Sequence, residues 1–422
     1  MLRTLSIFSL ACLLSSLGCA AKTPRYQVPD DLSVSDPRFS HVVASVLNSP
    51  LLPGNRVDTL INGDEIFPAM LEAIGSAEHT IAFETFVYWS GEVGEQFTQA
   101  LCERARAGVA VHVTIDAVGS SKIDGDYLDK MEEAGIQVVM YHRLKWTHFL
   151  NITDTPSLNF RTHRKLLVVD GKVGFIGGVG IADVWSGNAQ DEEHWRDNHY
   201  RVEGPAVSQI QAAFTDNWID TTGLVFTGPE YLPENEPAGM VDAQVFMSSP
   251  ESGGSRNMQL MYLLFIAGAR ESLWFTTPYF VLDGQSRQAL IEAKQRGVDV
   301  KIIVPRKIDQ PMVRHASRAF WGPLLEAGVE LYEYQPTMIH TKLMIVDGLW
   351  VSIGSANLDN RSFKLNDEAN LNVRDEEFAR RQRENFENDL GNSQRVTLEQ
   401  YESRPLPVKI WDHFASLFGP QM

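Results

Sequence analysis

Apolar residues along this chain recur in one order of strand and helix patterns, and that order occurs twice. Residues 80–118 begin with a strand pattern (TIAFETFVYW), continue with a helix pattern (EQFTQALCERARAG) and end with a second strand pattern (VAVHVTIDAV). Residues 272–304 repeat the order with SLWFTTPYFV, SRQALIEAKQRG and VDVKIIV. In each copy a further helical segment then ends at an Ala-Gly pair, 134–135 and 327–328. Alternating strand and helix patterns predict an α/β fold with a largely buried sheet.

A hairpin pattern follows each copy. The frames at 161–178 and 338–355 read RTHRKLLVVDGKVGFIGG and MIHTKLMIVDGLWVSIGS. In both, an apolar run leads to Asp-Gly, and a second apolar run leads to Gly-Gly or Gly-Ser. Asp-Gly between two β-rich runs is typical of a β-hairpin. Because the whole series is doubled, we expect two pseudo-symmetric halves with the active site where they meet.

Each hairpin frame carries the spacing H-x-K-x4-D. The two sets are His163, Lys165 and Asp170, and His340, Lys342 and Asp347. With Lys and Asp each at roughly 6% of residues, the 11 histidines would give roughly 0.04 chance matches. A histidine and a lysine two apart on an extended segment point to the same side. Two such pairs therefore offer a nucleophile, an acid and two cations, which suits a phosphodiester.

The two histidines divide the work of one displacement in this hypothesis. We predict that His163 is the nucleophile and that His340 is the general acid and then the base, although a pseudo-symmetric site also allows the reverse. Lys165 and Lys342 would hold the non-bridging oxygens. Further donors in the second half are expected from Asn357 and Ser355, whereas the position that matches Asn357 in the first half is Gly180. We count Asp170 and Asp347 with the catalytic motif, although we expect them to hold the hairpin turns through backbone or cross-half contacts instead of touching phosphorus.

The longer strings around these frames identify a family. NFRTHRKLLVVDG, WRDNHYRVEGPAV (195–207), TTPYFVLD (276–283) and SIGSANLDNRSFKLNDEANL (352–371) resemble the phospholipase D superfamily, and bacterial cardiolipin synthases in particular. The resemblance covers roughly residues 60–400. It implies that two phosphatidylglycerols give cardiolipin and glycerol through a phosphatidyl-histidine. It also implies a carboxylate behind each histidine, Asp197 for His163 and Glu368 for His340.

Two other functions remain open at this point. In a hydrolytic phospholipase D or a nuclease, water would replace the lipid alcohol. A catalytically inactive lipid-binding lipoprotein is suggested only by Gly180, and the intact histidines and lysines argue against it. The net charge of -17 and the lack of a long basic run argue against nucleic acid as a partner. We expect phospholipids and a membrane surface as partners, with no cofactor and, since no Cys/His cluster has zinc spacing, no metal; the oligomeric state is left open.

The chain ends predict export and attachment. Residues 1–18 carry Arg3 and then an apolar stretch shorter than the roughly 20 residues that span a bilayer, which is typical of a signal peptide. The residues before Cys19 resemble a lipoprotein processing site, so Cys19 would be lipidated on the periplasmic side of a bacterial cell envelope; the alternative is ordinary cleavage near Ala20. We divide the rest into a tether (19–50), the first half (51–227), a linker (228–241), the second half (242–400) and a C-terminal amphipathic segment (401–422).

Two apolar segments lie outside the repeat. The first half has 28 positions from Gly135 to His163, against 12 from Gly328 to His340. The extra residues form either a lip for acyl chains or simple packing; their apolar members are Leu144, Trp146, Phe149, Leu150 and Ile152. In the C-terminal segment, apolar residues at helical spacing predict a helix that either docks onto the body or lies in a membrane surface. These are Ile410, Trp411, Phe414, Leu417 and Phe418. Cys102, on the first predicted helix, is expected to be a small buried thiol.

Overall fold

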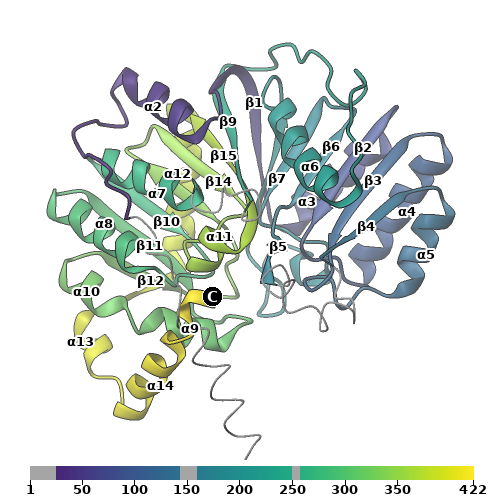
Figure 1. The fold of residues 1–422 in the computed structure, drawn as a ribbon. Coiled ribbons are helices and arrows are strands. Elements are labelled where there is room, and N and C mark those ends of the chain that lie inside the picture. Colours follow the sequence, from purple (N-terminus) through teal and green to yellow (C-terminus); the bar gives the residue numbers. More distant parts are fainter. Residues whose placement is uncertain (1–24, 143–158, 250–256) are drawn as a thin grey trace, which may run out of the picture.

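A single mixed sheet runs through both halves of the molecule (Figure 1). The structure, a computed structural model, describes residues 25–142, 159–249 and 257–422. The strands of the first half are β1 (Leu52–Ile61), β2 (Thr80–Thr85), β3 (Ala110–Asp116), β4 (Gln137–Tyr141), β5 (Arg161–Thr162), β6 (Leu166–Val169), β7 (Val173–Gly177) and β8 (Asn198–Glu203). Those of the second half are β9 (Val241–Ser248), β10 (Ser272–Thr276), β11 (Asp299–Pro305), β12 (Glu330–Tyr334), β13 (Leu343–Val346), β14 (Trp350–Gly354), β15 (Asn366–Arg374) and β16 (Ser393–Val396).

The strand order confirms the predicted pseudo-symmetry. The first half runs β4-β3-β2-β6-β7-β8-β1 and the second runs β12-β11-β10-β13-β14-β15-β9, with β16 added at the far edge. The halves join where β1 pairs with β9 in antiparallel register, Leu52 opposite Ala243. In each half, three parallel strands flank an antiparallel hairpin, as the strand-helix-strand and Asp-Gly patterns predicted.

Backbone geometry explains the Asp-Gly pair in each hairpin. Asp170 and Gly171 have φ values of 51° and 61°, and Asp347 and Gly348 have 50° and 60°. Two successive left-handed residues define the type I′ turn, whose twist matches that of the strands it joins. Glycine reaches this conformation without a steric cost, and aspartate tolerates it better than most residues. The register of the hairpin that follows each histidine is therefore fixed locally.

Helices cover the sheet and enclose the hydrophobic core. They are α2 (Pro37–Leu47), α3 (Asn62–Gly75), α4 (Glu92–Arg106), α5 (Gly125–Glu133), α6 (Val207–Thr222), α7 (Asn257–Gly268), α8 (Gly284–Gln295), α9 (Pro311–Arg318), α10 (Trp321–Glu326), α11 (Asn360–Lys364), α12 (Glu376–Gly391), α13 (Leu398–Glu402) and α14 (Leu406–Ser416). One large apolar cluster lies in each half, a third contains residues of both, including Trp218 of α6 and Phe386 of α12, and a small fourth joins α9 to α14. Cys102 is buried as predicted, on α4. The shared core fixes how the halves meet.

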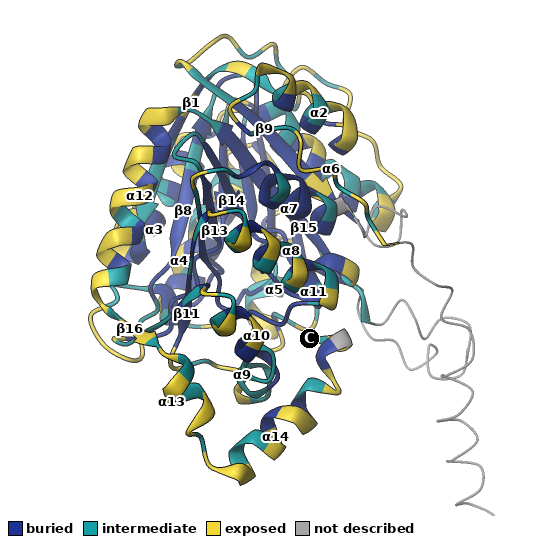
Figure 2. Ribbon diagram, turned by 90° about the vertical axis from the view of Figure 1, so that its left-hand side faces the viewer, coloured by how far each residue is buried: buried dark blue, intermediate teal, exposed yellow. Residues whose placement is uncertain are grey.

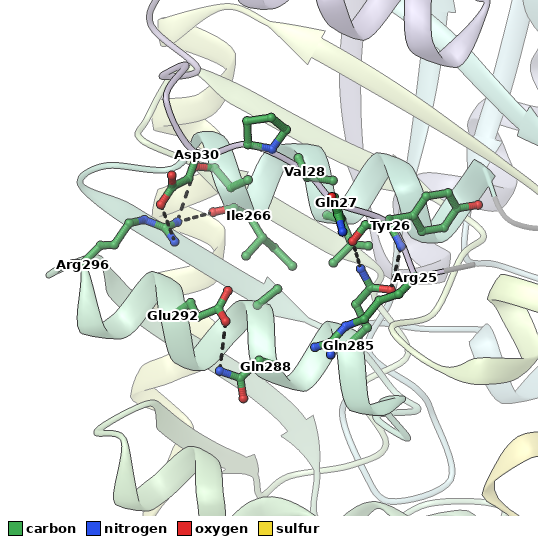
Figure 3. Close-up of a pocket in the computed structure, with 14 residues that line it drawn as sticks. Arg25, Tyr26, Gln27, Val28, Asp30, Ile266, Gln285, Gln288, Glu292 and Arg296 are labelled. Carbon is green, nitrogen blue, oxygen red and sulfur yellow. Dashed lines mark hydrogen bonds and ion pairs between the residues drawn. The ribbon is translucent and has the colours of Figure 1, made fainter. Parts of the chain in front are cut away.

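The predicted tether is wrong for residues 25–50, which pack onto the second half. Phe39 of α2 is buried with its ring 5.8 Å from that of Trp350, in an edge-on contact. Upstream, the Tyr26 N–H donates to Gln285 Oε1 at 3.2 Å, and Arg296 lies 3.8 Å from Asp30 (Figure 3). The segment thereby closes a cavity of about 360 Å³ against α7 and α8. Polar residues with several prolines suggested a tether, but the apolar residues of α2 outweigh them.

The structure describes the predicted linker but not the predicted leader or the insert of the first half. The predicted linker, 228–241, contains no helix or strand up to Met240, and β9 begins at its last residue, Val241. Both the leader with Cys19 and the insert with Trp146 lie outside the described residues. Within 25–142, 159–249 and 257–422, no helix is both long and apolar enough to cross a lipid bilayer.

Candidate active site

Each His-x-Lys segment is held against the opposite half of the protein. β5 pairs in parallel with β15, and the His163 N–H donates to the Asp367 carbonyl at 2.9 Å. An isolated bridge links Arg196 to Ile339, and the His340 N–H donates to the Arg196 carbonyl at 2.7 Å. Both histidines therefore reach the interface on backbone that the two halves share.

Side-chain alternation places histidine and lysine together, as predicted. His163 and Lys165 both line one cavity of about 260 Å³, and His340 lines it as well. Arg164, between them, points the other way, where its buried guanidinium donates to the Ala213 carbonyl at 2.5 Å. The expectation that both imidazoles converge on one cavity at the interface is confirmed.

The carboxylates behind the histidines are exchanged relative to the prediction. His163 Nδ1 lies 3.0 Å from Glu368 Oε1 and Oε2, and His340 Nδ1 lies 2.8 Å from Asp197 Oδ2. The expected pairs, Asp197 with His163 and Glu368 with His340, are therefore wrong. The cross-half strand contacts give the reason. Since Asp367 sits opposite Thr162, the next residue, Glu368, lies beside His163, and Asp197 follows the bridge residue Arg196 in the same way.

These contacts fix the protonation pattern of each ring. An ionised carboxylate only accepts hydrogen bonds, so Nδ1 carries the proton and Nε2 keeps its lone pair. The Trp185 indole donates to Asp197 at 3.1 Å, and the Ser362 hydroxyl donates to Glu368 at 2.7 Å. Each of the two imidazole rings is thus oriented by a carboxylate, and each carboxylate is held in turn by a hydrogen-bond donor.

Ser355 was predicted to bind phosphate, but its hydroxyl contacts Glu368 instead. Its hydroxyl donates to Glu368 Oε2 at 2.5 Å and accepts from the Ala369 N–H at 3.0 Å. The one proton of the hydroxyl is therefore committed to a carboxylate rather than to a phosphate. Gly178, the matching residue of the first half, leaves no room for this contact, because a Cβ there would lie 2.5 Å from Asp197 Oδ1.

Burial sets the charge state of the groups that form the cavity. Burial, together with the nearby lysine ammoniums, lowers the pKa of His163 and of His340 to about 4, although Glu368 and Asp197 oppose this shift. It also lowers the pKa of Lys165 to about 7 and that of Lys342 to about 8. Burial alone would raise the pKa of Glu368, but its contacts with His163 and Lys165 hold that pKa at about 2. At neutral pH the carboxylates are therefore ionised and the imidazoles neutral, and a phosphodiester anion would raise the pKa of both lysines and keep them protonated.

Asp170 and Asp347 act on the backbone, as predicted, and within their own half. Asp170 accepts from three successive N–H groups at the start of β2, those of Glu78, His79 and Thr80, at 2.7–2.9 Å. Asp347 accepts in the same way at the start of β10, from Arg270, Glu271 and Ser272, at 2.8–2.9 Å. Both carboxylates fasten the hairpin turn to the neighbouring strand, so they position the histidine segment without lining the cavity.

Aromatic residues that the sequence reasoning did not single out form much of the cavity wall. The ring centroid of Phe86 lies 5.1 Å from that of His163, and those of Trp185 and Trp195 lie 5.4 and 5.5 Å from that of His340. Tyr279 also lines the cavity and donates to Asp309 at 2.7 Å. Trp195 and Tyr279 lie within the strings WRDNH and TTPYF, so those strings held a signal for them.

The departure at Gly180 has a steric cause. A Cβ at this residue would lie 2.7 Å from Val87 Cβ and 3.1 Å from Trp185 Cζ3. The first half therefore has no space for the asparagine that Asn357 supplies in the second half. Asn357 itself is buried, and its Oδ1 has no hydrogen-bond partner among the described residues. Its predicted contact with phosphate stays a prediction.

The site also lacks the features of a metal centre in the part of the chain that the structure describes. There, no group of three or more His, Cys, Asp or Glu side chains is placed to hold a metal ion. The carboxylates nearest the histidines are already occupied by imidazole, indole and hydroxyl donors.

Comparisons with known proteins agree with this geometry. The family description "Cardiolipin synthase, PLD-like domain" matches residues 70–218 and 262–390, one segment in each half. A cardiolipin synthase of Geobacillus kaustophilus is 34% identical over 373 residues, 88% of this chain and 73% of that protein. Cardiolipin synthase 2 of Bacillus anthracis is 35% identical over 366 residues, 86% and 70% of the two chains. The crystal structure of a phosphatidylserine synthase of Haemophilus influenzae shares the fold, with a TM-score of 0.67 at 14% identity over 91% of this chain and 100% of that one. The chain therefore belongs to the cardiolipin synthase family of phospholipase D-like enzymes.

Proposed function

We propose that this enzyme transfers a phosphatidyl group from one phosphatidylglycerol to another, making cardiolipin and releasing glycerol. One observation supports this above the others: two imidazoles line one cavity, and the carboxylate behind each ring comes from the opposite half. The curated relatives that match most of the chain carry the name cardiolipin synthase.

The first displacement forms a covalent intermediate. Nε2 of His163 attacks phosphorus, the bond from phosphorus to the glycerol headgroup oxygen breaks, and the glycerol leaves as an alcohol after taking a proton from His340. Bringing a phosphodiester anion into the cavity raises the pKa of His340, so this imidazole is protonated when it is needed. Glu368 stabilises the positive charge that develops on the His163 ring.

The second displacement restores the enzyme. His340, now neutral, takes the proton from a headgroup hydroxyl of a second phosphatidylglycerol. That oxygen attacks phosphorus, and the phosphorus–nitrogen bond to His163 breaks to give cardiolipin. Lys165 and Lys342 hold the non-bridging oxygens in both steps, with Asn357 as a further donor.

Product analysis tests this proposal. Purified enzyme is incubated with phosphatidylglycerol vesicles, and cardiolipin with equimolar glycerol is expected. Phosphatidic acid as the dominant product would replace transfer by hydrolysis. His163→Ala and His340→Ala should each abolish product formation, and activity retained in either variant would contradict shared catalysis.

We also propose that the enzyme is exported and held at the periplasmic side of a bacterial envelope by a lipid on Cys19. The support is the sequence of residues 1–19 alone. Metabolic labelling of cells with an alkyne fatty acid should mark the wild-type chain and leave Cys19→Ser unmarked. Equal labelling of both would refute lipidation at this residue.

A further inference from the structure

An apolar strip lies on the outward side of α14 and the turn after it. Trp411 stacks on Phe414 at 5.2 Å, and Phe414 contacts Phe418 edge-on at 5.5 Å. Exposed residues line this helix at one end of the molecule (Figure 2). The strip consists of Leu406, Ile410, Trp411, Phe414, Leu417 and Phe418, all exposed. Leu406, Ile410 and Leu417 are the most open, at 69%, 61% and 71% exposure.

The opposite side of the same helix is firmly docked. Asp412 is buried and accepts from His315 Nδ1 at 2.6 Å and from Arg404. Ala415 is fully buried against Ala316 and Val281. The two alternatives for this segment are therefore not exclusive: its polar and small residues bind the body, and its large apolar residues face away from it.

α9 connects the helix that carries the strip with the catalytic cavity. α9, which contacts α14, begins directly after Gln310, an exposed residue of the cavity lining. Beyond the strip, the Arg361 N–H of α11 donates to the Met422 carbonyl at 2.9 Å. The same short helix provides Ser362, which holds Glu368. Figure 1 shows α9 and α14 together at the lower end of the second half, with β5 nearer the middle of the molecule.

We infer that the strip on α14 inserts into the surface of a lipid bilayer and brings the cavity rim to the membrane. This inference rests on the proposed function, since a phosphatidylglycerol substrate resides in the bilayer. Tryptophan and phenylalanine beside leucine and isoleucine are the composition of helices that lie in the membrane interface.

Charge favours a bilayer reached through apolar contact. With a net charge of -17, the protein gains nothing overall from attraction to an anionic phosphatidylglycerol surface. Apart from the proposed lipid on Cys19, apolar insertion is then the contact that binds the folded part to the bilayer, because no basic run in the sequence offers an electrostatic alternative. Vesicle binding through the strip should accordingly persist at high salt, where electrostatic attachment fails.

A label on the strip tests insertion in the full-length enzyme, whether or not the N-terminus is anchored. A fluorophore is attached to Leu417→Cys, and the matched control carries it at Leu224→Cys, an exposed leucine (52%) after α6. With phosphatidylglycerol vesicles that contain nitroxide lipids, the label at 417 should be quenched and the label at 224 should not. Equal quenching at both positions, or none at 417, would overturn the inference.

Turnover separates this inference from the proposed function. Leu406→Ser/Ile410→Ser/Leu417→Ser should lose on the order of tenfold or more in kcat/KM on vesicles. It should keep wild-type turnover on a short-chain phosphatidylglycerol below its micelle concentration. Leu224→Ser/Val225→Ser/Met240→Ser removes three exposed apolar side chains elsewhere and should match the wild type on both.

The remaining outcomes are also decisive. If the strip variant changes the mass of the particle in solution but inserts and turns over normally, the strip is a contact between two copies and the inference fails. If the wild type converts neither substrate while the label at 417 is quenched, the proposed function fails and the membrane surface stands. Point substitutions are preferred to truncation, because removing the C-terminus would also release α11.

Discussion

The pairing of His163 with Glu368 and of His340 with Asp197 predicts which variants share a kinetic defect. Glu368→Gln removes the charge behind His163, and Asp197→Asn removes the charge behind His340. Both carboxylates are completely buried, so water does not replace them. Loss of a hydrogen bond to a charged group costs about 1.5–3 kcal/mol, or about 10- to 150-fold in rate. An amide that also turns the ring to the wrong tautomer costs up to about 10⁴-fold.

An activated leaving group separates the two defects. With phosphatidyl-p-nitrophenol as the substrate, p-nitrophenolate leaves without a proton from a general acid. Variants that lack the general acid or its carboxylate should therefore still form the covalent enzyme in a rapid-quench experiment. We expect Asp197→Asn to follow His340→Ala and regain this burst, while Glu368→Gln follows His163→Ala and forms the intermediate slowly. If the roles of the histidines are reversed, each carboxylate should still follow its own histidine.

The opposite association would refute the reasoning. If Asp197→Asn shares the defect of His163→Ala, each carboxylate serves the histidine of its own half in the working enzyme. Circular dichroism and thermal unfolding of all four variants provide the control, because a fold defect would lower every rate together.

Three further predictions concern the histidines, the turns that position them and the cavity lining. The pKa of about 4 for His163 and His340 means that, between pH 6.5 and 4, these imidazoles take up protons in the unfolded chain and not in the folded one, while buried carboxyls with a raised pKa, such as Glu84 and Asp359 at about 7, act in the opposite direction. The free energy of unfolding of His163→Gln, measured relative to the wild type in denaturant titrations, should therefore rise as pH drops through this window. Asp170→Ala and Asp347→Ala each leave three backbone N–H groups without their acceptor, which should lower the free energy of unfolding by about 1–3 kcal/mol in urea titrations; lost activity at unchanged stability would contradict a structural role. Gly180→Asn should lower both the melting temperature and activity instead of completing a symmetric site, since Val87 occupies the space; higher activity would show that the lining yields.

Local patterns predicted the parts of the fold that depend on neighbouring residues. The Asp-Gly turns, the strand-helix-strand order and the common side of His163 and Lys165 all follow from spacing and backbone preference. The role of Asp170 was also accessible, because a carboxylate next to a turn glycine faces the adjacent strand. The duplication then predicted the interface site, since matched patterns require matched surfaces to meet.

Tertiary contacts decided what local patterns left undetermined. A motif places Asp197 and Glu368 near a histidine, but only the parallel pairing of β5 with β15 shows which histidine. The polar composition of residues 22–50 predicted a tether, while three buried residues of α2, at a spacing of four, bind the segment to the second half. For Ser355, the type of residue suggested a phosphate donor; its position beside Glu368 depends on strand register, which spacing along the chain does not reveal.

Because each histidine pairs with a carboxylate of the opposite half, neither half can form a complete catalytic site alone. A half that folded alone would present its histidine with Nδ1 unpaired, since the partner carboxylate belongs to the other half. The backbone acceptor that holds each histidine segment would be missing too, because Asp367 and Arg196 belong to the opposite half. Assembly of the interface and completion of the acid–base pair are therefore one event. A site that holds one phosphate between two imidazoles therefore forms only when both halves pack together. The apolar core that they share holds them in that position.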